Sequence, residues 1–415
     1  MRSSKAQAVA EKWYGERAYA SSAEVWGIHS KRMGGAARLW IAAALCAIAV
    51  TLAGCVPSAP PTPPGEPPRT VLSGTPPPAS PTAAPVASPV PPVTPAVPRL
   101  TPPPEPPATP APNGWQRVGL AAQDLRAVAA DPANPRVLYA GGALLSGSID
   151  GGRTWQPLRA VRSLQALLVV GGDLFVAASD GCARGTRAPA LRSGDGGATW
   201  QEIGANLRSI AARPDGSALY AAGCPGILRS DDGGREWRTV ASATGREGFA
   251  VAVSPVQPDV VWAAFVSEGG GVLVQRSTDG GRTWQRAEPS GELWAPAMLA
   301  LHPRQAEILY LATRNGIWRT ADAGGTWARA EQGLEATRRV EGAVTLYDVA
   351  AVLQLADRVV LASASAGVYT SRWEEPSFAR LPGALPLTRD LALQSGAPPA
   401  LLAATADGVY RSPLR

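Results

Sequence analysis

Hydrophobic and polar positions alternate in short runs from Trp115 to the end of the chain, and no helical period is present among them. The plan is visible in an apolar run from Leu125 to Ala130, a turn-forming Asp-Pro-Ala-Asn-Pro, and a second run from Val137 to Ala140. The same order recurs in the segments that begin at Ser209, Val251 and Leu299. Short apolar runs at regular spacing, separated by turn residues, predict an all-β repeat array.

An octapeptide of the form Ser/Thr-x-Asp-x-Gly-x-Thr-Trp follows the third predicted strand of most units. Five copies begin at Ser148, Ser193, Ser230, Ser277 and Thr320, and only Glu236 replaces the threonine. Each copy ends in a tryptophan; these are Trp155, Trp200, Trp237, Trp284 and Trp327, spaced 45, 37, 47 and 43 residues apart. This spacing is typical of a supersecondary repeat. A catalytic centre is normally built once, so five copies favour a structural role.

The repeats add up to seven four-stranded units. Five complete units end near Leu158, Ile203, Val240, Ala287 and Ala330. A sixth has Phe378 in place of the tryptophan, and a seventh begins at Asp390 but ends after its third strand. The segment Asn-Gly-Trp-Gln-Arg-Val from Asn113 supplies the missing fourth strand, and pairing it with the last unit closes the ring and leaves only short edges. Residues 113–415 are therefore predicted to form a seven-bladed β-propeller.

The octapeptide resembles the Asp-box, or bacterial neuraminidase repeat, which in its families forms the hairpin between the third and fourth strands of a blade. Its carboxylates are Asp150, Asp195, Asp232, Asp279 and Asp322. We expect each to accept backbone N–H bonds within its turn, and each tryptophan to pack between blades. One carboxylate per turn is too few for the 6–8 oxygens that calcium takes. No metal and no cofactor is predicted.

An apolar run from Leu39 to Leu52 follows three basic residues and has the layout of a secretory signal. Its end, Leu52-Ala53-Gly54-Cys55, resembles the lipobox of bacterial lipoproteins, which implies removal of residues 1–54 and lipidation of Cys55. Met33 would give a signal of ordinary length, and an uncleaved anchor is the alternative. The prediction is an extracytoplasmic, membrane-anchored lipoprotein.

Residues 55–112 form a proline-rich linker. Between Val56 and Asn113 lie 24 of the 41 prolines and only four charged residues, so this segment cannot bury enough apolar surface to fold. Without residues 1–54 the chain has 32 basic and 30 acidic residues, a balance that does not favour a nucleic-acid partner. We expect a monomer. Cys182 and Cys224 lie at matching points of consecutive repeats, and both a disulfide and two separate thiols fit this pattern.

Asp-box propellers include the sialidases, a resemblance that implies an arginine triad, a Tyr/Glu nucleophile pair and an Arg-Ile-Pro motif. The nearest match to that motif is Arg380-Leu-Pro382, which lies in the sixth unit at a repeat position. His302 is the only histidine after the signal segment, which argues against a histidine-dependent nucleophile. A glycosidase needs only two carboxylates, and this alternative stays open.

Binding residues are expected on the face opposite the Asp boxes, where loops join second to third strands and one blade to the next. The longest loops span residues 179–190, 266–271, 286–296 and 331–347. The candidate side chains are Arg184, Arg187, Glu268, Glu292, Trp294, Arg338, Arg339, Glu341 and Tyr347. A solvated loop side chain is the simpler interpretation of each, although Trp294 lies outside the repeat pattern and has to pack locally or meet a ligand.

The layout also resembles the photosystem II stability/assembly factor family, non-enzymatic propellers that bind membrane-protein intermediates, reportedly through an arginine-rich surface. Here arginines recur in third strands, at Arg192, Arg229, Arg276, Arg319 and Arg411, although cross-strand pairing would also account for them. The resemblance implies a non-catalytic scaffold that binds a protein or glycan. The alternative is an extracellular glycosidase or glycan-binding protein that uses Glu268, Glu292 or Glu341.

Overall fold

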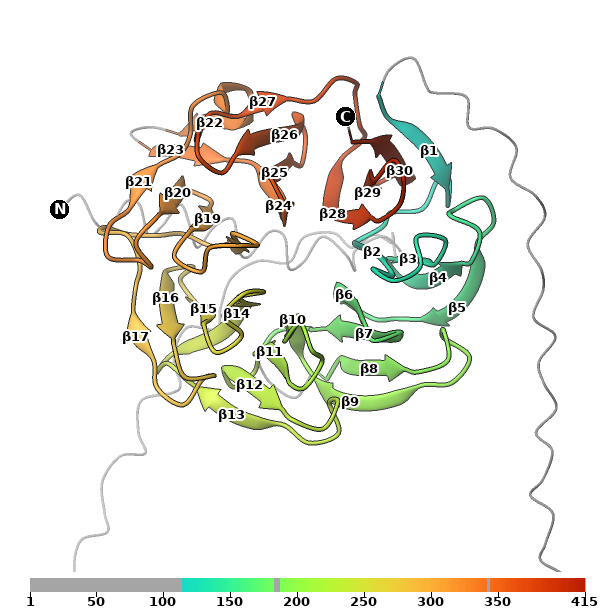
Figure 1. The fold of residues 1–415 in the computed structure, drawn as a ribbon, viewed down its shortest axis with the longest axis horizontal. Coiled ribbons are helices and arrows are strands. Elements are labelled where there is room, and N and C mark those ends of the chain that lie inside the picture. Colours follow the sequence, from blue (N-terminus) through green and yellow to red (C-terminus); the bar gives the residue numbers. More distant parts are fainter. Residues whose placement is uncertain (1–113, 183–186, 342–343, 415) are drawn as a thin grey trace, which may run out of the picture. The chain divides into compact units, whose positions relative to one another are not determined.

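The computed structural model describes residues 114–182, 187–341 and 344–414, which form a closed ring of β-sheets (Figure 1). Seven sheets have four antiparallel strands and an eighth has two. The described part is thus the seven-bladed β-propeller that the repeats predicted; its one helical element is the 3-10 turn η1 (Glu335–Thr337), and no described helix is long and apolar enough to cross a membrane. The predicted signal peptide, Cys55 and the proline-rich linker lie outside the described residues.

The blades are numbered here in chain order. Blade 1 consists of β2 (Ala127–Ala130), β3 (Leu138–Gly141), β4 (Leu144–Ser148) and β5 (Gln156–Ala160). Blade 2 consists of β6 (Leu164–Val170), β7 (Asp173–Ala178), β8 (Pro189–Ser193) and β9 (Gln201–Ala205). Blade 3 consists of β10 (Leu207–Ala212), β11 (Leu219–Gly223), β12 (Ile227–Ser230) and β13 (Arg238–Ala241). Blade 4 consists of β14 (Arg246–Val253), β15 (Val261–Ser267), β16 (Val272–Ser277) and β17 (Gln285–Arg286).

Blade 5 consists of β18 (Ala297–Leu301), β19 (Leu309–Thr313), β20 (Gly316–Thr320) and β21 (Ala328–Arg329). The separate two-stranded sheet pairs β22 (Arg338–Glu341) with β23 (Val344–Tyr347). Blade 6 consists of β24 (Val349–Gln354), β25 (Arg358–Ser363), β26 (Gly367–Arg372) and β27 (Ala379–Arg380). Blade 7 consists of β28 (Thr388–Gln394), β29 (Ala400–Thr405) and β30 (Gly408–Pro413), and it is completed by β1 (Gln116–Gly119).

The ring is closed by strands from the two ends of the described chain. Strand β1 pairs antiparallel with β30, with Gln116 opposite Arg411 and Arg117 opposite Tyr410. Figure 1 shows β1 beside the last three strands, at the rim of blade 7. This pairing gives blade 7 its fourth strand, as the orphan segment near Asn113 predicted.

Each blade places its first strand near the centre of the ring and its fourth at the rim (Figure 1). The second strands are almost wholly buried and rich in alanine, such as β11 (LYAAG) and β29 (ALLAAT). Small side chains allow neighbouring blades to approach closely where the ring is narrow. Larger residues pack between the blades farther out.

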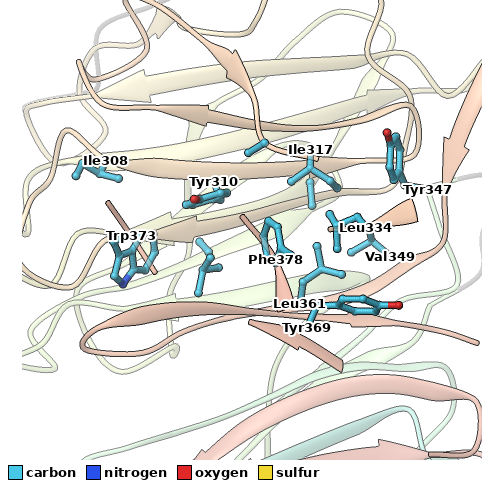
Figure 2. Packing of buried hydrophobic residues seen from close by; sticks show 14 residues of the cluster. Ile308, Tyr310, Ile317, Leu334, Tyr347, Val349, Leu361, Tyr369, Trp373 and Phe378 are labelled. Carbon is cyan, nitrogen blue, oxygen red and sulfur yellow. The ribbon is translucent and has the colours of Figure 1, made fainter. Parts of the chain in front are cut away.

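Aromatic side chains fill the space between blades 5 and 6 (Figure 2). The ring of Tyr310 lies edge-on to Phe378, with centroids 6.1 Å apart, and 5.6 Å from the ring of Trp373. Phe378 directly precedes β27 and is 4% exposed, so it buries apolar surface at the position where other blades have the Asp-box tryptophan. Aromatic pairs in such geometry stabilise a core by about 0.5–1.5 kcal/mol beyond their buried area.

The Asp boxes form the hairpins between third and fourth strands, and the aspartate organises each turn. In blade 4, Asp279 accepts the N–H groups of Arg282 at 2.9 Å and Thr283 at 2.8 Å. The Thr283 hydroxyl donates to the second carboxylate oxygen at 2.6 Å. Ser277 donates to Asp279 and accepts the N–H of Gly281, both at 2.8 Å. The carboxylate therefore replaces the backbone partners that a tight turn lacks.

These hydrogen bonds favour the charged carboxylate. The threonine hydroxyl and N–H that follow lower the pKa of Asp195 to about 2, and the same arrangement lowers the pKa of Asp322 to about 2. The pKa of Asp279 is held well below its usual range for the same reason. In blade 3, Asp232 accepts the N–H of Glu236, which offers no hydroxyl.

In two boxes the tryptophan hydrogen-bonds to the blade before its own. The indole N–H of Trp284 is shared between the carbonyl oxygen of Gly281, at 3.1 Å, and that of Val240 on β13, at 3.0 Å. Trp155 does the same with Gly152, at 3.1 Å, and Val118 on β1, at 3.2 Å. The repeated motif thus forms part of the contact between blades.

Candidate functional site

The loops at the two ends of the blades make two different faces. In blade 4 the N–H of Gly280 in the Asp box donates to the carbonyl oxygen of Asp259, in the turn between the first and second strands, at 2.9 Å. Gly151 and Arg136 make the equivalent bond of 2.8 Å in blade 1. We call this the hairpin face. The opposite end, where second strands lead to third strands and one blade leads to the next, is the loop face.

Two of the third-strand arginines hold neighbouring blades together. Arg229 on β12 donates to the carbonyl oxygen of Gly280 in the next blade at 2.7 Å, and Arg319 on β20 donates to that of Trp373 in blade 6 at 3.1 Å. Arg192 on β8 donates to Asp173 of its own blade at 2.9 and 2.6 Å. A stripe of arginines in the sequence is therefore not a free basic surface.

Arg276 precedes the blade 4 box and also lies in a contact between blades. Its guanidinium carbon is 5.9 Å from the ring centre of Trp262, and its Nε has no hydrogen-bond partner among the described residues. Burial lowers the pKa of the guanidinium. Trp262 in turn lies edge-on to Trp327 of blade 5, with centroids 6.1 Å apart. Arg276 thus packs within the ring, although the sequence left it as a functional candidate.

A disulfide connects two loops of the loop face. Cys182, in the loop between β7 and β8, is bonded to Cys224, which follows β11 in blade 3, and their Cα atoms are 5.6 Å apart. The structure thus contains the disulfide that was one of the two alternatives left open by the sequence. In the same loop Arg187 is exposed and forms an ion pair with Glu202 on β9; Arg184 lies outside the described residues.

Glu268 and Glu292 lie on loops of blade 4 that contact each other. Gly271 and Trp294 form a β-bridge, and the N–H of Val272 donates to the carbonyl oxygen of Leu293 at 2.9 Å. Both glutamates are exposed and Trp294 is half-buried. The N–H of Trp294 is held by the side chain of Asn315 at 2.9 Å, so its backbone is fixed against blade 5. The structure brings these three candidates to one region of the loop face.

Residues 331–347, which the sequence analysis treated as a long loop, instead contain η1 and the β22–β23 hairpin. Arg338, Arg339 and Val340 are exposed on β22, and Val340 is 61% exposed. Arg339 forms an ion pair of 2.5 Å with Glu341. This hairpin lies outside the seven blades, and its polar, charged β22 was not predicted as a strand because its sequence lacks alternation.

Tyr347 was expected at the binding face, and this expectation is wrong. The residue is 7% exposed and packs in the core with Leu334 and Val349 (Figure 2). Its hydroxyl donates to Glu331 at 2.7 Å. Burial and the neighbouring carboxylate raise the pKa of the hydroxyl group. Tyr347 lies outside the blade repeat because it anchors the base of the hairpin.

A set of paired charges at the loop-face ends of the inner strands was not identified from the sequence. We call it the mouth cluster; it comprises Asp124, Arg162, Asp180, Arg208, Glu247 and Arg389. Arg208 pairs with Glu247 at 2.6 Å and lies 5.2 Å from the ring centre of Phe249. Arg389 donates to Asp124 at 2.9 and 3.2 Å.

Two of these arginines occupy the same structural position. Arg208 and Arg389 are each skipped in the pairing of a first strand with its second strand, where a β-bulge shifts the register. A bulge redirects a side chain at the edge of a sheet. The signal in the sequence was a charged residue just before the apolar run of an inner strand, and recognising it requires the register.

The described residues contain one group of side chains that could together bind a metal ion. The one group of three ligand-type side chains whose donor atoms lie within 4.8 Å of each other is Cys182, Cys224 and Glu247. Both sulfur atoms are engaged in the disulfide, which leaves one carboxylate. The oxidised protein therefore offers no complete ligand set at this position.

Comparisons with known proteins identify the repeat and the fold. Residues 275–286 match the family model described as BNR/Asp-box repeat. Over 162 residues the chain is 30% identical to a xyloglucanase of Hypocrea jecorina (strain QM6a), a match that covers 38% of this chain and 18% of the xyloglucanase. The chain thus spans under a fifth of the length of this relative.

Solved structures with the same fold include YCF48 and an enzyme. YCF48 from Cyanidioschyzon merolae has a TM-score of 0.53 at 17% identity, over 72% of this chain and 98% of that one. A structure of YCF48 bound to D1 peptide has a TM-score of 0.52 at 16% identity, over 74% and 100%. An ancestral GH74 enzyme has a TM-score of 0.54 at 19% identity, over 74% of this chain and 46% of the enzyme. At these identities the likeness shows the fold alone.

Proposed function

We propose that this protein is a lipid-anchored, extracytoplasmic and non-catalytic scaffold whose loop face binds a protein partner. The observation that carries the proposal is the preformed character of that face. The disulfide fixes the β7–β8 loop to blade 3, and paired charges such as Arg208 and Glu247 surround it. A rigid surface loses little conformational entropy on binding. A propeller of the same fold, YCF48, has been solved bound to a peptide, which supports a protein as the partner.

The β22–β23 hairpin offers the side chains that such a contact needs. Arg338 is exposed beside Val340, and Val340 is 61% exposed. Arginine and apolar side chains that become buried together contribute strongly to protein interfaces. On the hairpin face, by contrast, the box carboxylates are engaged in bonds within their own turns, as Asp279 is.

The two faces can be compared directly in cells. A photo-crosslinking amino acid is placed at Val340 on the loop face or at Ile149 on the hairpin face; the two residues are equally exposed, at 61%. We expect a discrete cross-linked protein from the Val340 position and none from the Ile149 position. Equal cross-linking from both positions, or none from either, would contradict the proposal.

The lipid anchor rests on the lipobox-like Leu52-Ala53-Gly54-Cys55, which lies outside the described residues. Cells that express the protein are fed labelled palmitate, and the Cys55→Ala variant is compared with the wild type. We expect label in the wild type alone, with the variant released from the membrane fraction. Label that persists in Cys55→Ala would refute the anchor and leave the loop-face proposal standing.

A glycosidase or glycan-binding protein is the second candidate, because Glu268 and Glu292 lie on contacting loops and enzymes share the fold. The xyloglucanase match and the ancestral GH74 enzyme favour a glucan as the substrate class to test. Glycoside hydrolysis uses two carboxylates on either side of the scissile bond. The purified protein is incubated with xyloglucan and other β-glucans, and Glu268→Gln, Glu292→Gln and Glu341→Gln are compared with the wild type. Hydrolysis lost in one variant would establish the enzyme and overturn the scaffold.

A further inference from the structure

A hollow of about 350 Å³ opens on the hairpin face between blades 5 and 6. It lies between the first turns of the two blades and the degenerate hairpin of blade 6. Its lining includes His302, Arg304, Gln305, Asp357, Arg372 and Glu374. Its position is opposite the loop face, so it is independent of the function proposed above.

One difference between blades 3 and 5 lies beside the hollow. In blade 3 the residue that follows the inner strand and precedes the turn proline is Arg213, and its guanidinium reaches Asp259 of blade 4 at 2.8 Å. His302 holds the equivalent position in blade 5, and Asp357 of blade 6 is the equivalent of Asp259. Asp357 pairs instead with its neighbour Arg358 at 2.6 Å. The shorter imidazole leaves the space between the blades unbridged.

The hairpin of blade 6 forms another wall. It lacks the Asp box, and Trp373 fills the space behind it, fully buried, with its indole N–H donating to the carbonyl oxygen of Leu355 at 3.0 Å. Glu374 follows on the exposed side. The position that holds a self-contained turn in five blades therefore presents an exposed carboxylate in this one.

His302 lines the hollow and has one ring nitrogen that is not used in its turn. The residue is 4% exposed, and its Nδ1 accepts the backbone N–H groups of Arg304 at 3.0 Å and Gln305 at 3.1 Å. Burial lowers the pKa of the imidazole, so the ring is neutral at pH 7 and carries its proton on Nε2. Among the described residues no acceptor bonds to this nitrogen. His302 lines the hollow, so this donor is available to a bound ligand.

The charges around the hollow favour an anion. Arg304 and Arg372 make no ion pair with any carboxylate of the described residues, whereas Asp357 is already engaged by Arg358. The lining has two guanidinium groups and two carboxylates, and because Arg358 engages Asp357, Arg304 and Arg372 are left against Glu374 alone. A planar guanidinium suits the forked recognition of a carboxylate or phosphate.

We propose that this hollow binds a single anionic sugar unit. Its carboxylate or phosphate would contact Arg304 and Arg372, and its hydroxyl groups would accept from Nε2 of His302 and donate to Glu374. The polar walls suit a ring with hydroxyl groups, and the volume lies within the roughly 300–1,000 Å³ range of small-molecule sites.

Histidine-selective labelling of the full-length protein tests the site, since the sequence has only two histidines, His29 and His302. The His302 imidazole signal is followed by NMR during titration with glucuronate, glucose 6-phosphate, glucose and inorganic phosphate. We expect a saturable shift with glucuronate or glucose 6-phosphate, and whichever acts identifies the acidic group. No shift with either sugar acid, or an equal shift with inorganic phosphate or glucose, would overturn the proposal.

Variants separate binding from folding. His302→Asn keeps an acceptor for the turn, as Asp131 does in blade 1 by accepting the N–H of Ala133 at 2.8 Å, but removes the Nε2 donor. Arg372→Gln removes one guanidinium, and Arg282→Gln removes an exposed arginine of the same face as a control. By calorimetry we expect about tenfold weaker binding in the first two variants and no change in Arg282→Gln.

His302→Arg rebuilds the bridge that Arg213 makes to the next blade, and it should abolish binding while the protein stays folded. Unchanged affinity in His302→Asn and Arg372→Gln, or full binding by His302→Arg, would place the ligand elsewhere and refute the site.

Discussion

The guanidinium of Arg229 donates a hydrogen bond of 2.7 Å to the carbonyl oxygen of Gly280, which lies in the Asp box of the next blade. The hydroxyl of Tyr220 donates to the same oxygen at 3.0 Å. Two side chains of blade 3 thus hold the hairpin of blade 4. The Asp box of blade 4 is therefore both a turn within its own blade and an acceptor for blade 3.

Replacing Arg229 with methionine should destabilise the ring. The variant keeps most of the apolar stem but leaves Gly280 with only the tyrosine bond and removes the ion pair to Asp231, which measures 2.6 Å. We expect a loss of about 1–3 kcal/mol, measured by thermal or denaturant unfolding. Arg282→Met, on the exposed part of the blade 4 box, is the control. Equal stability of the two variants would show that the contact between blades contributes nothing.

A substitution in the Asp box of blade 3 should raise the stability of the protein. Glu236 occupies the place of the threonine whose hydroxyl donates to the box carboxylate elsewhere, as Thr154 does to Asp150 at 2.6 Å. Glu236→Thr restores this bond, and we expect the melting temperature to rise by about 1 °C. Glu236→Val, similar in shape but without the hydroxyl group, is the control. If both substitutions change the melting temperature equally, the hydroxyl–carboxylate bond is not the cause.

The blades could be predicted from the sequence because the residues that form each turn are close together in the chain and the pattern is repeated. The turn chemistry of a box such as Ser277 to Trp284 requires only nearby residues, and five copies reveal the unit. The closure of blade 7 could be predicted because the last unit lacks a fourth strand and the segment near Asn113 is a strand without a blade. Pairing the two completes the ring. The hairpin β22–β23 was not predicted because Arg338-Arg-Val-Glu does not alternate between polar and apolar residues.

Candidate binding residues were harder to predict because exposure and pairing depend on the tertiary structure. Tyr347 was selected because it lies in one of the longest predicted loops, yet it is buried against Leu334. Arg208 was overlooked because its pairing with Glu247 joins two neighbouring blades. His302 was considered only as a catalytic histidine, and the hollow beside it depends on Asp357, more than fifty residues away in the chain.

The stability that the Asp boxes contribute should fall as the pH drops from 4 to 2. The pKa of Asp195 is lowered to about 2 by the hydroxyl and N–H of Thr199, whereas an unfolded aspartate titrates near ~3.9. The stability that this carboxylate contributes is present above pH ~4 and is lost as the pH falls towards 2. Asp195→Asn should be less stable than the wild type at pH 7, with the difference shrinking between pH 4 and 2. Denaturant midpoints measured across this range check the prediction; a constant difference would contradict it.

A rise in pH should also destabilise the folded protein, in this case through the carboxylate of Asp390. This carboxylate on β28 accepts the N–H of Val128 on β2 at 3.1 Å and that of Leu391 at 2.9 Å, so it joins the first and last blades. Burial raises its pKa to about 7. Because the folded pKa lies above the unfolded value, its contribution is full below pH ~4 and is lost as the pH rises through 7.

Asp390→Asn removes this titration while keeping one acceptor oxygen. We expect the variant to gain up to about 4 kcal/mol relative to the wild type between pH 4 and pH 8, measured from unfolding midpoints at both values. Asp357→Asn, whose carboxylate lies at the surface, is the control and should show no such gain. If the wild type and Asp390→Asn keep a constant difference over this range, the carboxyl is already charged in the folded protein.

Loss of the disulfide should loosen the loop face without unfolding the ring. Cys182 and Cys224 are separated by 42 residues in sequence, and a crosslink over a loop of this length contributes about 2–4 kcal/mol by restricting the unfolded chain. The double variant Cys182→Ala/Cys224→Ala should therefore unfold at lower denaturant concentration than the oxidised wild type. Added reductant should lower the midpoint of the wild type to that of the variant and leave the variant unchanged.

Arg187→Gln, which removes only an exposed ion pair in the same loop, should retain the wild-type midpoint and its sensitivity to reductant. A wild-type midpoint that is insensitive to reductant would mean that the bond contributes nothing to stability.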